Sequence, residues 1–154
     1  MADYFMDTSD LVKRHVTEEG SAWVKSLVRA ETGHTLYIAR ITAVEVTSAI
    51  TRRQHAGDLS AVQAGAILGH FRRHLTQRYR VIELTPALFA EAMLMARRRR
   101  LRAYDAVQLA VALEVRRLHR ESGLGPITLV SADRELNAAA AAEGMPIDDP
   151  NAHP

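Results

Sequence analysis

Four acidic residues stand at positions of the sequence where their carboxylates could act together. Each follows a predicted strand or lies at the start of a predicted helix; they are Asp7, Glu45, Asp105 and Asp133. Carboxylates that lie close together raise one another's pKa, so a cluster of four requires a divalent cation to offset its charge. A ligand set made only of oxygen atoms suits a hard ion such as Mg²⁺ or Mn²⁺.

The elements that must position these acids alternate between short apolar runs and helical patterns. We predict strands over residues 4–7, 36–39, 79–84 and 127–130, with an edge strand near 145–147. We predict helices over residues 9–17, 42–55, 60–76, 105–120 and 133–143, with further helices beginning at Ser21 and at Pro86. This alternation indicates a single α/β domain with a mainly parallel sheet of four to five strands, covered by helices on both faces. We expect the domain to span residues 1–148 and residues 149–154 to form a loose tail.

Parallel strands bring the four acids to one edge of the predicted sheet. Open parallel sheets bind their ligands outside the carboxyl ends of the strands. Asp7 lies at the carboxyl end of the first strand and Asp133 just beyond that of the strand over 127–130. Glu45 lies in the first turn of the helix after the strand over 36–39, and Asp105 opens a later helix. The sequence therefore predicts that the four carboxylates meet.

Each acid also has a purely structural interpretation. The segment Thr42-Ala43-Val44-Glu45 fits a capping box, in which the glutamate returns a hydrogen bond to the first residue of the helix. Asp7 and Asp105 could be N-caps, and Asp133 could complement a helix dipole. Taken singly, these interpretations are favoured, but four acids at one sheet edge are more than capping requires.

The composition excludes several classes of chemistry. The chain of 154 residues contains no cysteine, so disulfides, thiolate nucleophiles and cysteine-ligated zinc are ruled out. No segment reads as a secretory signal or approaches the roughly 18 apolar residues of a membrane span. We therefore expect a soluble cytoplasmic protein. Lysine occurs only at Lys13 and Lys25, so the basic residues are nearly all arginine. This excess of arginine indicates either a phosphate-bearing or acidic partner or simply a GC-rich genome, and we weigh the two explanations equally.

Four motifs in order along the chain resemble those of a known nuclease family. They are Asp7-Thr8-Ser9, Thr42-Ala43-Val44-Glu45, Arg102-Ala103-Tyr104-Asp105-Ala106-Val107-Gln108-Leu109-Ala110 and Leu129-Val130-Ser131-Ala132-Asp133. Together they resemble the PIN-domain ribonucleases, and in particular the VapC-type toxins of bacterial toxin–antitoxin pairs. The resemblance runs from residue 4 to about 148 and implies a PIN-like three-layer α/β/α nuclease domain.

The resemblance also implies a site and partners. It makes Asp7, Glu45 and Asp105 the core acids that bind Mg²⁺ or Mn²⁺, with Asp133 as the fourth and Ser9 and Ser131 as supporting hydroxyls. It implies hydrolysis of RNA phosphodiester bonds, a homodimer and a small antitoxin protein that covers the acidic groove. Whether one or two ions act, and which RNA is cleaved, stays open.

Five arginines stand just before Asp105 in the sequence: Arg97, Arg98, Arg99, Arg100 and Arg102. They could form a rim that binds RNA phosphates, or they could stabilise the carboxyl end of a helix. We weigh these interpretations equally. The seven histidines are expected to lie on the surface rather than to bind metal.

Two other classes of phosphoryl-transfer protein are excluded because the sequence lacks a residue that each requires, whereas a non-catalytic binding protein is not excluded. A haloacid-dehalogenase-type enzyme needs a second aspartate where this chain has Ser9, and a response-regulator receiver domain needs a lysine on a late strand. A PIN-fold binding module that acts through protein or RNA contacts without turnover remains the alternative. The complete set of four acids argues against it.

Overall fold

The computed structural model describes residues 1–153, which form a five-stranded parallel sheet with seven α-helices packed around it. The strands are β1 (Asp3–Met6), β2 (Thr35–Ala39), β3 (Tyr79–Ile82), β4 (Ile127–Val130) and β5 (Ile147–Asp148). Their order across the sheet is β3-β2-β1-β4-β5, and every pair is parallel. The predicted α/β class and parallel sheet are therefore confirmed, and the strand bounds differ from those expected by one or two residues.

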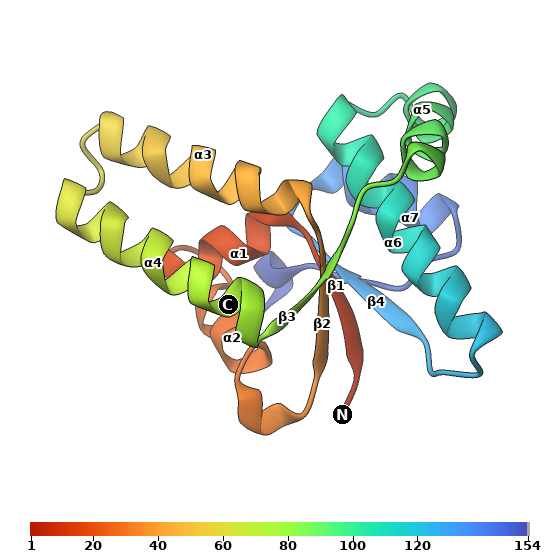
Figure 1. Ribbon diagram of the computed structural model, residues 1–154, viewed down its shortest axis with the longest axis horizontal. Coiled ribbons are helices and arrows are strands. Elements are labelled where there is room, and N and C mark those ends of the chain that lie inside the picture. Colours follow the sequence, from red (N-terminus) through yellow and green to blue (C-terminus); the bar gives the residue numbers. More distant parts are fainter. Residues whose placement is uncertain (154) are drawn as a thin grey trace.

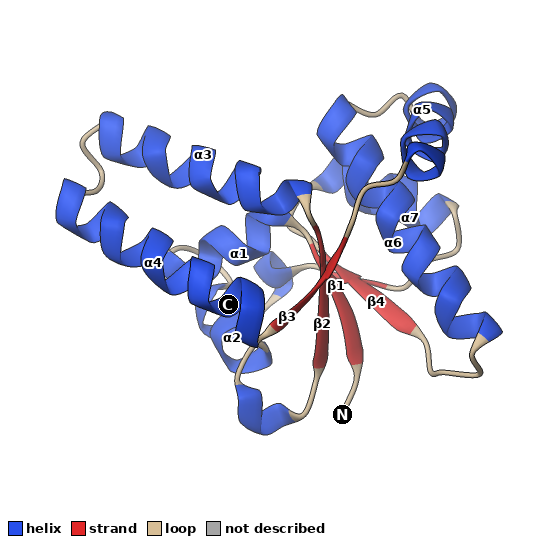
Figure 2. Ribbon diagram, in the orientation of Figure 1, coloured by secondary structure: helices blue, strands red, loops and turns tan. Residues whose placement is uncertain are grey.

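Helices cover the two faces of the sheet in two separate groups (Figure 1). The helices are α1 (Thr8–His15), α2 (Ser21–Leu27), α3 (Ile41–His55), α4 (Ala61–Gln77), α5 (Pro86–Arg99), α6 (Ala103–Glu121) and α7 (Arg134–Ala142). Helices α1 to α4 pack on one face and α5 to α7 on the other, with the strands fanned between them (Figure 2). The fold is thus the expected three-layer α/β/α arrangement.

The alternation of side chains along the strands explains the two hydrophobic cores. In β1, Phe5 packs with α5, α6 and α7, whereas Met6 packs with α1 and α3 on the other face. In β4, Leu129 and Val130 divide between the same two cores. Because consecutive residues of a strand point to opposite faces, both must be apolar when helices cover both. These strands therefore appear in the sequence as continuous apolar runs.

Residues 149–153 are packed and not loose, which corrects the expectation for the tail; Pro154 lies outside the described residues. A short 3₁₀ helix, η2 (Pro150–Ala152), packs against α2. His153 stacks on Trp23 with ring centroids 4.2 Å apart and pairs with Asp148. Gly20, at a φ of 78°, makes room for this segment, because a Cβ there would lie 2.5 Å from the carbonyl oxygen of Pro150.

The expectation that all histidines lie on the surface is wrong for several of them. His119 is buried and contacts the Tyr37 hydroxyl and the Gly125 carbonyl, at 3.0 Å each. His15 of α1 packs on His70 of α4, and His70 packs on His74, with centroids 5.3 and 4.2 Å apart. His70 and His74 stand four residues apart on one helix face, a spacing that was visible in the sequence but overlooked.

Candidate active site

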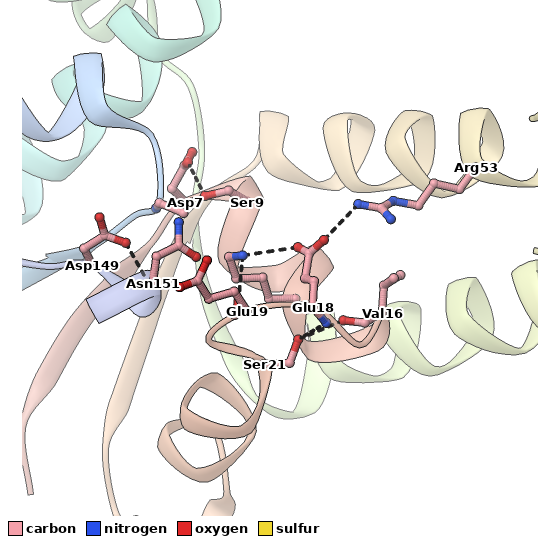
Figure 3. Close-up of polar contacts among 11 residues, drawn as sticks. Asp7, Ser9, Val16, Glu18, Glu19, Ser21, Arg53, Asp149 and Asn151 are labelled. Carbon is pink, nitrogen blue, oxygen red and sulfur yellow. Dashed lines mark hydrogen bonds and ion pairs between the residues drawn. The ribbon is translucent and has the colours of Figure 1, made fainter. Parts of the chain in front are cut away.

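Asp7 lies directly after β1, at the N-cap position of α1, and its side chain is almost completely buried. Its side chain makes no capping hydrogen bond. Instead, Asp7 Oδ2 accepts a hydrogen bond of 3.0 Å from the hydroxyl of Ser9 (Figure 3). It accepts a second one, of 3.3 Å, from the hydroxyl of Ser131. The capping interpretation of Asp7 is therefore wrong, and the carboxylate is held by two hydroxyl groups at the carboxyl ends of β1 and β4.

Glu45 lies in the second turn of α3 and is half-buried. The helix begins at Ile41 after Arg40, and no side chain caps it, so the predicted capping box is absent. The Thr42 hydroxyl and Glu45 Oε1 are both bound by the side-chain amide of Gln108 in α6, at 2.7 and 3.1 Å. Glu45 is thus connected to α6 rather than to the start of its own helix.

Asp105 and Asp133 differ in their relation to the helices that carry them. Asp105 is the third residue of α6, whose N-cap is Arg102, so the N-cap interpretation is wrong there. Asp133 is the N-cap of α7, and its Oδ1 accepts a hydrogen bond of 2.9 Å from the backbone N–H of Leu136. Of the four acids, only Asp133 caps a helix, a role that stabilises the fold and needs no further function.

The carboxylates of Asp7, Glu45 and Asp105 lie close enough to other acids of this edge for their pKa values to be raised. Burial is the main cause that raises the pKa of Asp7, and the charge of Asp133 adds to it. Burial also raises the pKa of Glu45, with further contributions from Asp7 and Asp105. The pKa of Asp105 rises to about 6 because of burial and the charges of Asp133 and Asp7. The structure therefore brings together the acids that the strand order placed at one edge.

Two more acids belong to this region and were missed in the sequence. Asp10 is fully buried one turn after Asp7, and neither of its carboxylate oxygens has a hydrogen-bond partner within residues 1–153. Burial, followed by the charge of Asp7, raises its pKa well above the ordinary value. Glu135, in the first turn of α7, also raises the pKa of Asp105. The acidic groups at this edge are therefore more numerous than the four that were predicted.

The two supporting serines join the ends of β1 and β4. The Ser131 hydroxyl donates to Asp7 and accepts from the backbone N–H of Asp133 at 3.0 Å. The Ser9 hydroxyl donates to Asp7 and accepts from the backbone N–H of Ala132 at 3.3 Å. Each hydroxyl therefore links Asp7 to the loop that carries Asp133.

The five arginines are separated by the structure into groups with different neighbours. Arg98 and Arg99 form ion pairs with Glu143, next to the carboxyl end of α7, at 3.3 and 3.0 Å. Arg102 lies close enough to Asp105 to lower its pKa. Arg97 is in the last turn of α5 and Arg100 ends that helix with a φ of 55°. Only Arg102 is electrostatically linked to the acidic edge.

The donor chemistry of this edge fits a hard divalent cation. Within residues 1–153, no group of three or more His, Cys, Asp or Glu side chains is arranged to hold a metal ion as it stands. Mg²⁺ does not need such a group, because it keeps several water ligands and is bound through one or two carboxylates. Burial and neighbouring carboxylates raise the pKa of Asp7 and of Asp105, and a bound cation would favour the ionised form of both groups.

Gln108 is a further residue that the sequence interpretation left without a role. It stands in the apolar run Ala106-Val107-Gln108-Leu109-Ala110 of a buried helix. A polar residue in such a run must find hydrogen-bond partners, and that was the available signal. For Asp10 no such signal existed, because a third-position acid of a helix is common on exposed surfaces.

The comparisons with known proteins agree with this geometry. The sequence model of the PIN domain matches residues 4–142. No curated protein sequence matches the chain. None of the described helices is long and apolar enough to cross a membrane.

Several solved structures share the fold over nearly the whole chain. PAE2754 from Pyrobaculum aerophilum is 24% identical, with a TM-score of 0.62, and the match covers 98% of this chain and 91% of that one. VapC20 from Mycobacterium tuberculosis, a toxin described as cleaving the sarcin-ricin loop, is 20% identical, with a TM-score of 0.62 and coverages of 88% and 94%. The FitAcB structure from Neisseria gonorrhoeae is 14% identical, with a TM-score of 0.62 and coverages of 96% and 97%.

Proposed function

Because this chain belongs to the PIN-domain family, we propose that it is a Mg²⁺- or Mn²⁺-dependent endoribonuclease that acts as the toxin of a toxin–antitoxin pair. The observation that carries the proposal is the proximity of four carboxylates at the carboxyl edge of the sheet: the pKa of Asp7, Glu45 and Asp105 is raised by burial and by neighbouring acids, among them Asp133. A toxin from Mycobacterium tuberculosis and a toxin–antitoxin complex from Klebsiella pneumoniae, both solved structures with this fold, support it.

The residues of the edge have distinct parts in this proposal. Asp7 and Asp105 would hold the cation, since burial and like charge leave both in need of a compensating charge. Glu45 would contribute a further carboxylate from α3, and Asp133 the oxygen that does not cap α7. A bound cation would supply charge for the phosphoryl oxygens and lower the pKa of a water molecule. Ser9 and Ser131 would keep the Asp7 carboxylate oriented.

The chain's own residues would also place the RNA. Arg102 stands beside Asp105 and is the arginine best placed to contact a phosphate next to the acids. Arg98 and Arg99 are already paired with Glu143, so their contribution would be smaller. We include Arg97 and Arg100 in the proposed rim on sequence position alone.

Cleavage of RNA by the purified protein tests the proposal. We expect cleavage with Mg²⁺ or Mn²⁺, its loss on chelation, and products with 5′-phosphate and 3′-hydroxyl ends. Asp7→Asn should abolish it, whereas Asp58→Asn, at an exposed turn between α3 and α4, should not. Cleavage that resists chelation, or that survives Asp7→Asn, would contradict the proposed site. Metal binding by the acids without cleavage of any RNA would favour the non-catalytic binding module.

The partners in this proposal are an antitoxin protein and a second copy of the chain, in the cytoplasm. The antitoxin is supported by the toxin–antitoxin complexes that share the fold. For the homodimer, α5 offers an apolar surface, because Phe89, Met93 and Leu94 are all exposed on it. Large exposed apolar side chains gathered on one element are typical of interfaces.

Light scattering after size exclusion tests the dimer. We expect the mass of two chains for the unmodified protein and of one chain for Met93→Glu. The matched control is Val62→Glu on α4, where a single apolar side chain is exposed by 83%. A monomeric unmodified protein, or a dimer that Met93→Glu does not weaken, would contradict this assignment.

A further inference from the structure

Gln108 is a buried amide in the interior of the molecule. It lies in α6 one turn after Asp105, and its exposed fraction is 1%. Its neighbours in the sequence, Val107 and Leu109, are buried apolar residues of the core. A buried amide in such a place is retained only where hydrogen bonds compensate for its lost hydration.

The amide group of Gln108 contacts three side chains from two other helices. Gln108 Nε2 donates to Thr42 Oγ1 at 2.7 Å and to Glu45 Oε1 at 3.1 Å, both in α3. Thr8 Oγ1, in α1 beside Asp7, lies at 3.4 Å and is the weakest of the three acceptors. The amide therefore joins α6, α3 and α1 at the point where each helix carries or adjoins one of the clustered acids.

Glu45 determines which way the amide faces. A carboxylate only accepts hydrogen bonds, whereas the Thr42 and Thr8 hydroxyls can donate or accept. Reversing the amide would set its oxygen against Glu45 Oε1, so the nitrogen must face the carboxylate. As a result Gln108 Oε1 is buried without a donor within residues 1–153. The contact with Glu45 therefore sets the orientation of the amide and leaves Gln108 Oε1 without a hydrogen bond in the described part of the chain.

We infer that Gln108 is a positioning residue that selects the cation by occupying one oxygen of Glu45. The hydrogen bond from Gln108 to Oε1 fixes the orientation of the carboxylate, which the Thr8 hydroxyl also contacts, and leaves Oε2 as the oxygen to which Gln108 does not donate. Glu45 then offers a single oxygen to a cation. The inference rests on the proposed function, because it requires that a cation binds at this edge.

A single-oxygen ligand distinguishes among hard cations. Ca²⁺ takes six to eight oxygen ligands and uses carboxylates in either the one-oxygen or the two-oxygen mode. Mg²⁺ requires octahedral geometry with fewer ligands, and Mn²⁺ shares its preference for oxygen. By withholding Oε1, Gln108 lowers the number of ligands available and so disfavours Ca²⁺ more than Mn²⁺.

The test compares the binding of Mn²⁺ and of Ca²⁺ to the purified protein by titration calorimetry without RNA. In Gln108→Leu, which keeps the side chain's approximate size but removes the amide, we expect Mn²⁺ affinity to fall about tenfold, as for other residues that orient metal ligands. Ca²⁺ affinity should be unchanged or should rise, so the preference for Mn²⁺ falls by at least the same factor. Gln54→Leu, an exposed position on α3, should change neither affinity.

Two outcomes overturn the inference, and they differ from a failure of the proposed function. Equal losses for both ions in Gln108→Leu would indicate a purely structural role, and unchanged affinities would indicate none. If the unmodified protein binds neither ion, the proposed function fails first. In the Glu45→Gln background, Gln108→Leu should have no further effect on the Mn²⁺ to Ca²⁺ ratio, because the carboxylate that it positions is gone.

A second measurement does not depend on the folding of the Gln108→Leu protein. The side-chain amide of Gln108 gives its own pair of resonances in a ¹⁵N–¹H spectrum. The Glu45→Gln substitution should shift them strongly, because the charged acceptor is lost. An amide resonance that does not respond to Glu45→Gln would overturn the contact on which the inference rests.

Discussion

The two ends of helix α1 lie in opposite electrostatic surroundings. At its amino end, Asp7 and Asp10 stand among acids, and burial raises the pKa of both. At its carboxyl end, Arg14 and His15 stand among cationic and imidazole groups of α4, and burial lowers the pKa of His15 to about 4. Both ends crowd like groups together, and burial is the largest cause of the shifts at both.

The difference lies in how each end can relieve its crowding. His15 and His74, each with a pKa of about 4, are neutral at pH 7, and burial and the charge of Arg14 lower the pKa of His70 as well. The pKa of the crowded carboxylates is raised instead, so these groups become neutral by taking up a proton or stay charged when a cation binds. Crowding alone therefore does not identify a site. The acidic end is the better candidate because its crowded groups are carboxylates, which can bind a cation in place of a proton.

The largest difference between the two ends should appear in activity. Asp105→Asn should lower the rate of RNA cleavage on the order of 10²–10³-fold, since it removes a carboxylate from the proposed cation site. The same change should raise the free energy of unfolding without metal by roughly 0.5–1 kcal/mol, a figure reduced because Asp105 is partly exposed. Cleavage rates and urea unfolding measure both.

The control for this prediction lies at the other end of α1. His15→Leu should leave cleavage within about twofold of the unmodified protein, because the histidine cluster has no part in the proposed chemistry. If His15→Leu lowers cleavage as much as Asp105→Asn does, the comparison between the two ends fails.

The next effect concerns acid stability at the histidine end. The folded pKa of His15 and His74, about 4, lies below the ordinary value of 6.5, so the unfolded chain binds more protons between these values. Stability is therefore complete above about pH 6.5 and is lost as the pH falls towards 4. We expect a loss of roughly 1–2 kcal/mol between pH 7 and pH 5, less than the full shifts give because both rings are partly exposed.

Urea unfolding at the two pH values measures this loss. His15→Leu should lose less stability on acidification than the unmodified protein, and His55→Leu, at the exposed end of α3, should lose as much. Asp105 acts in the opposite sense, since its folded pKa of about 6 exceeds its ordinary value and its contribution weakens as the pH rises through that range. An unchanged pH dependence in His15→Leu would show that the cluster does not titrate as described.

The smallest effect concerns the arginines around the acidic end. Arg102→Gln should weaken RNA binding in the presence of chelator about threefold at low salt, because its charge adjoins the acids. Arg98→Gln should weaken it less, because that side chain is paired with Glu143. Fluorescence anisotropy with labelled RNA distinguishes the two, and equal effects would mean that the ion pair with Glu143 does not withhold Arg98 from RNA.

Much of the acidic end could be predicted from the sequence because its geometry follows from strand order. Asp7 and Asp133 come directly after apolar runs, so parallel strands place them at one edge. The assignment of Glu45 and Asp105 to the site was less secure, because a carboxylate near the start of a helix has a capping role as often as a chemical one. Only the structure decided that Asp133 caps a helix and that Asp7, Glu45 and Asp105 do not.

What could not be predicted depends on contacts between distant segments. Asp10 is buried together with the end of the chain, where residues 149–153 pack beside α2, and no local pattern announces that packing. The contact of Gln108 with Glu45 spans 63 residues and required the mutual placement of α3 and α6. The histidine cluster is different. The spacing of His70 and His74 on one helix could be read from the sequence, whereas the proximity of His15 to them could be seen only in the structure.

Binding of Mn²⁺ to the purified protein without RNA tests the central claim most directly. The claim is that the crowded carboxylates at the carboxyl edge of the sheet form a cation site. Titration calorimetry should detect a site that is lost in both Asp7→Asn and Asp105→Asn and retained in His15→Leu. No binding to the unmodified protein, or binding that both aspartate substitutions leave intact, would contradict the account.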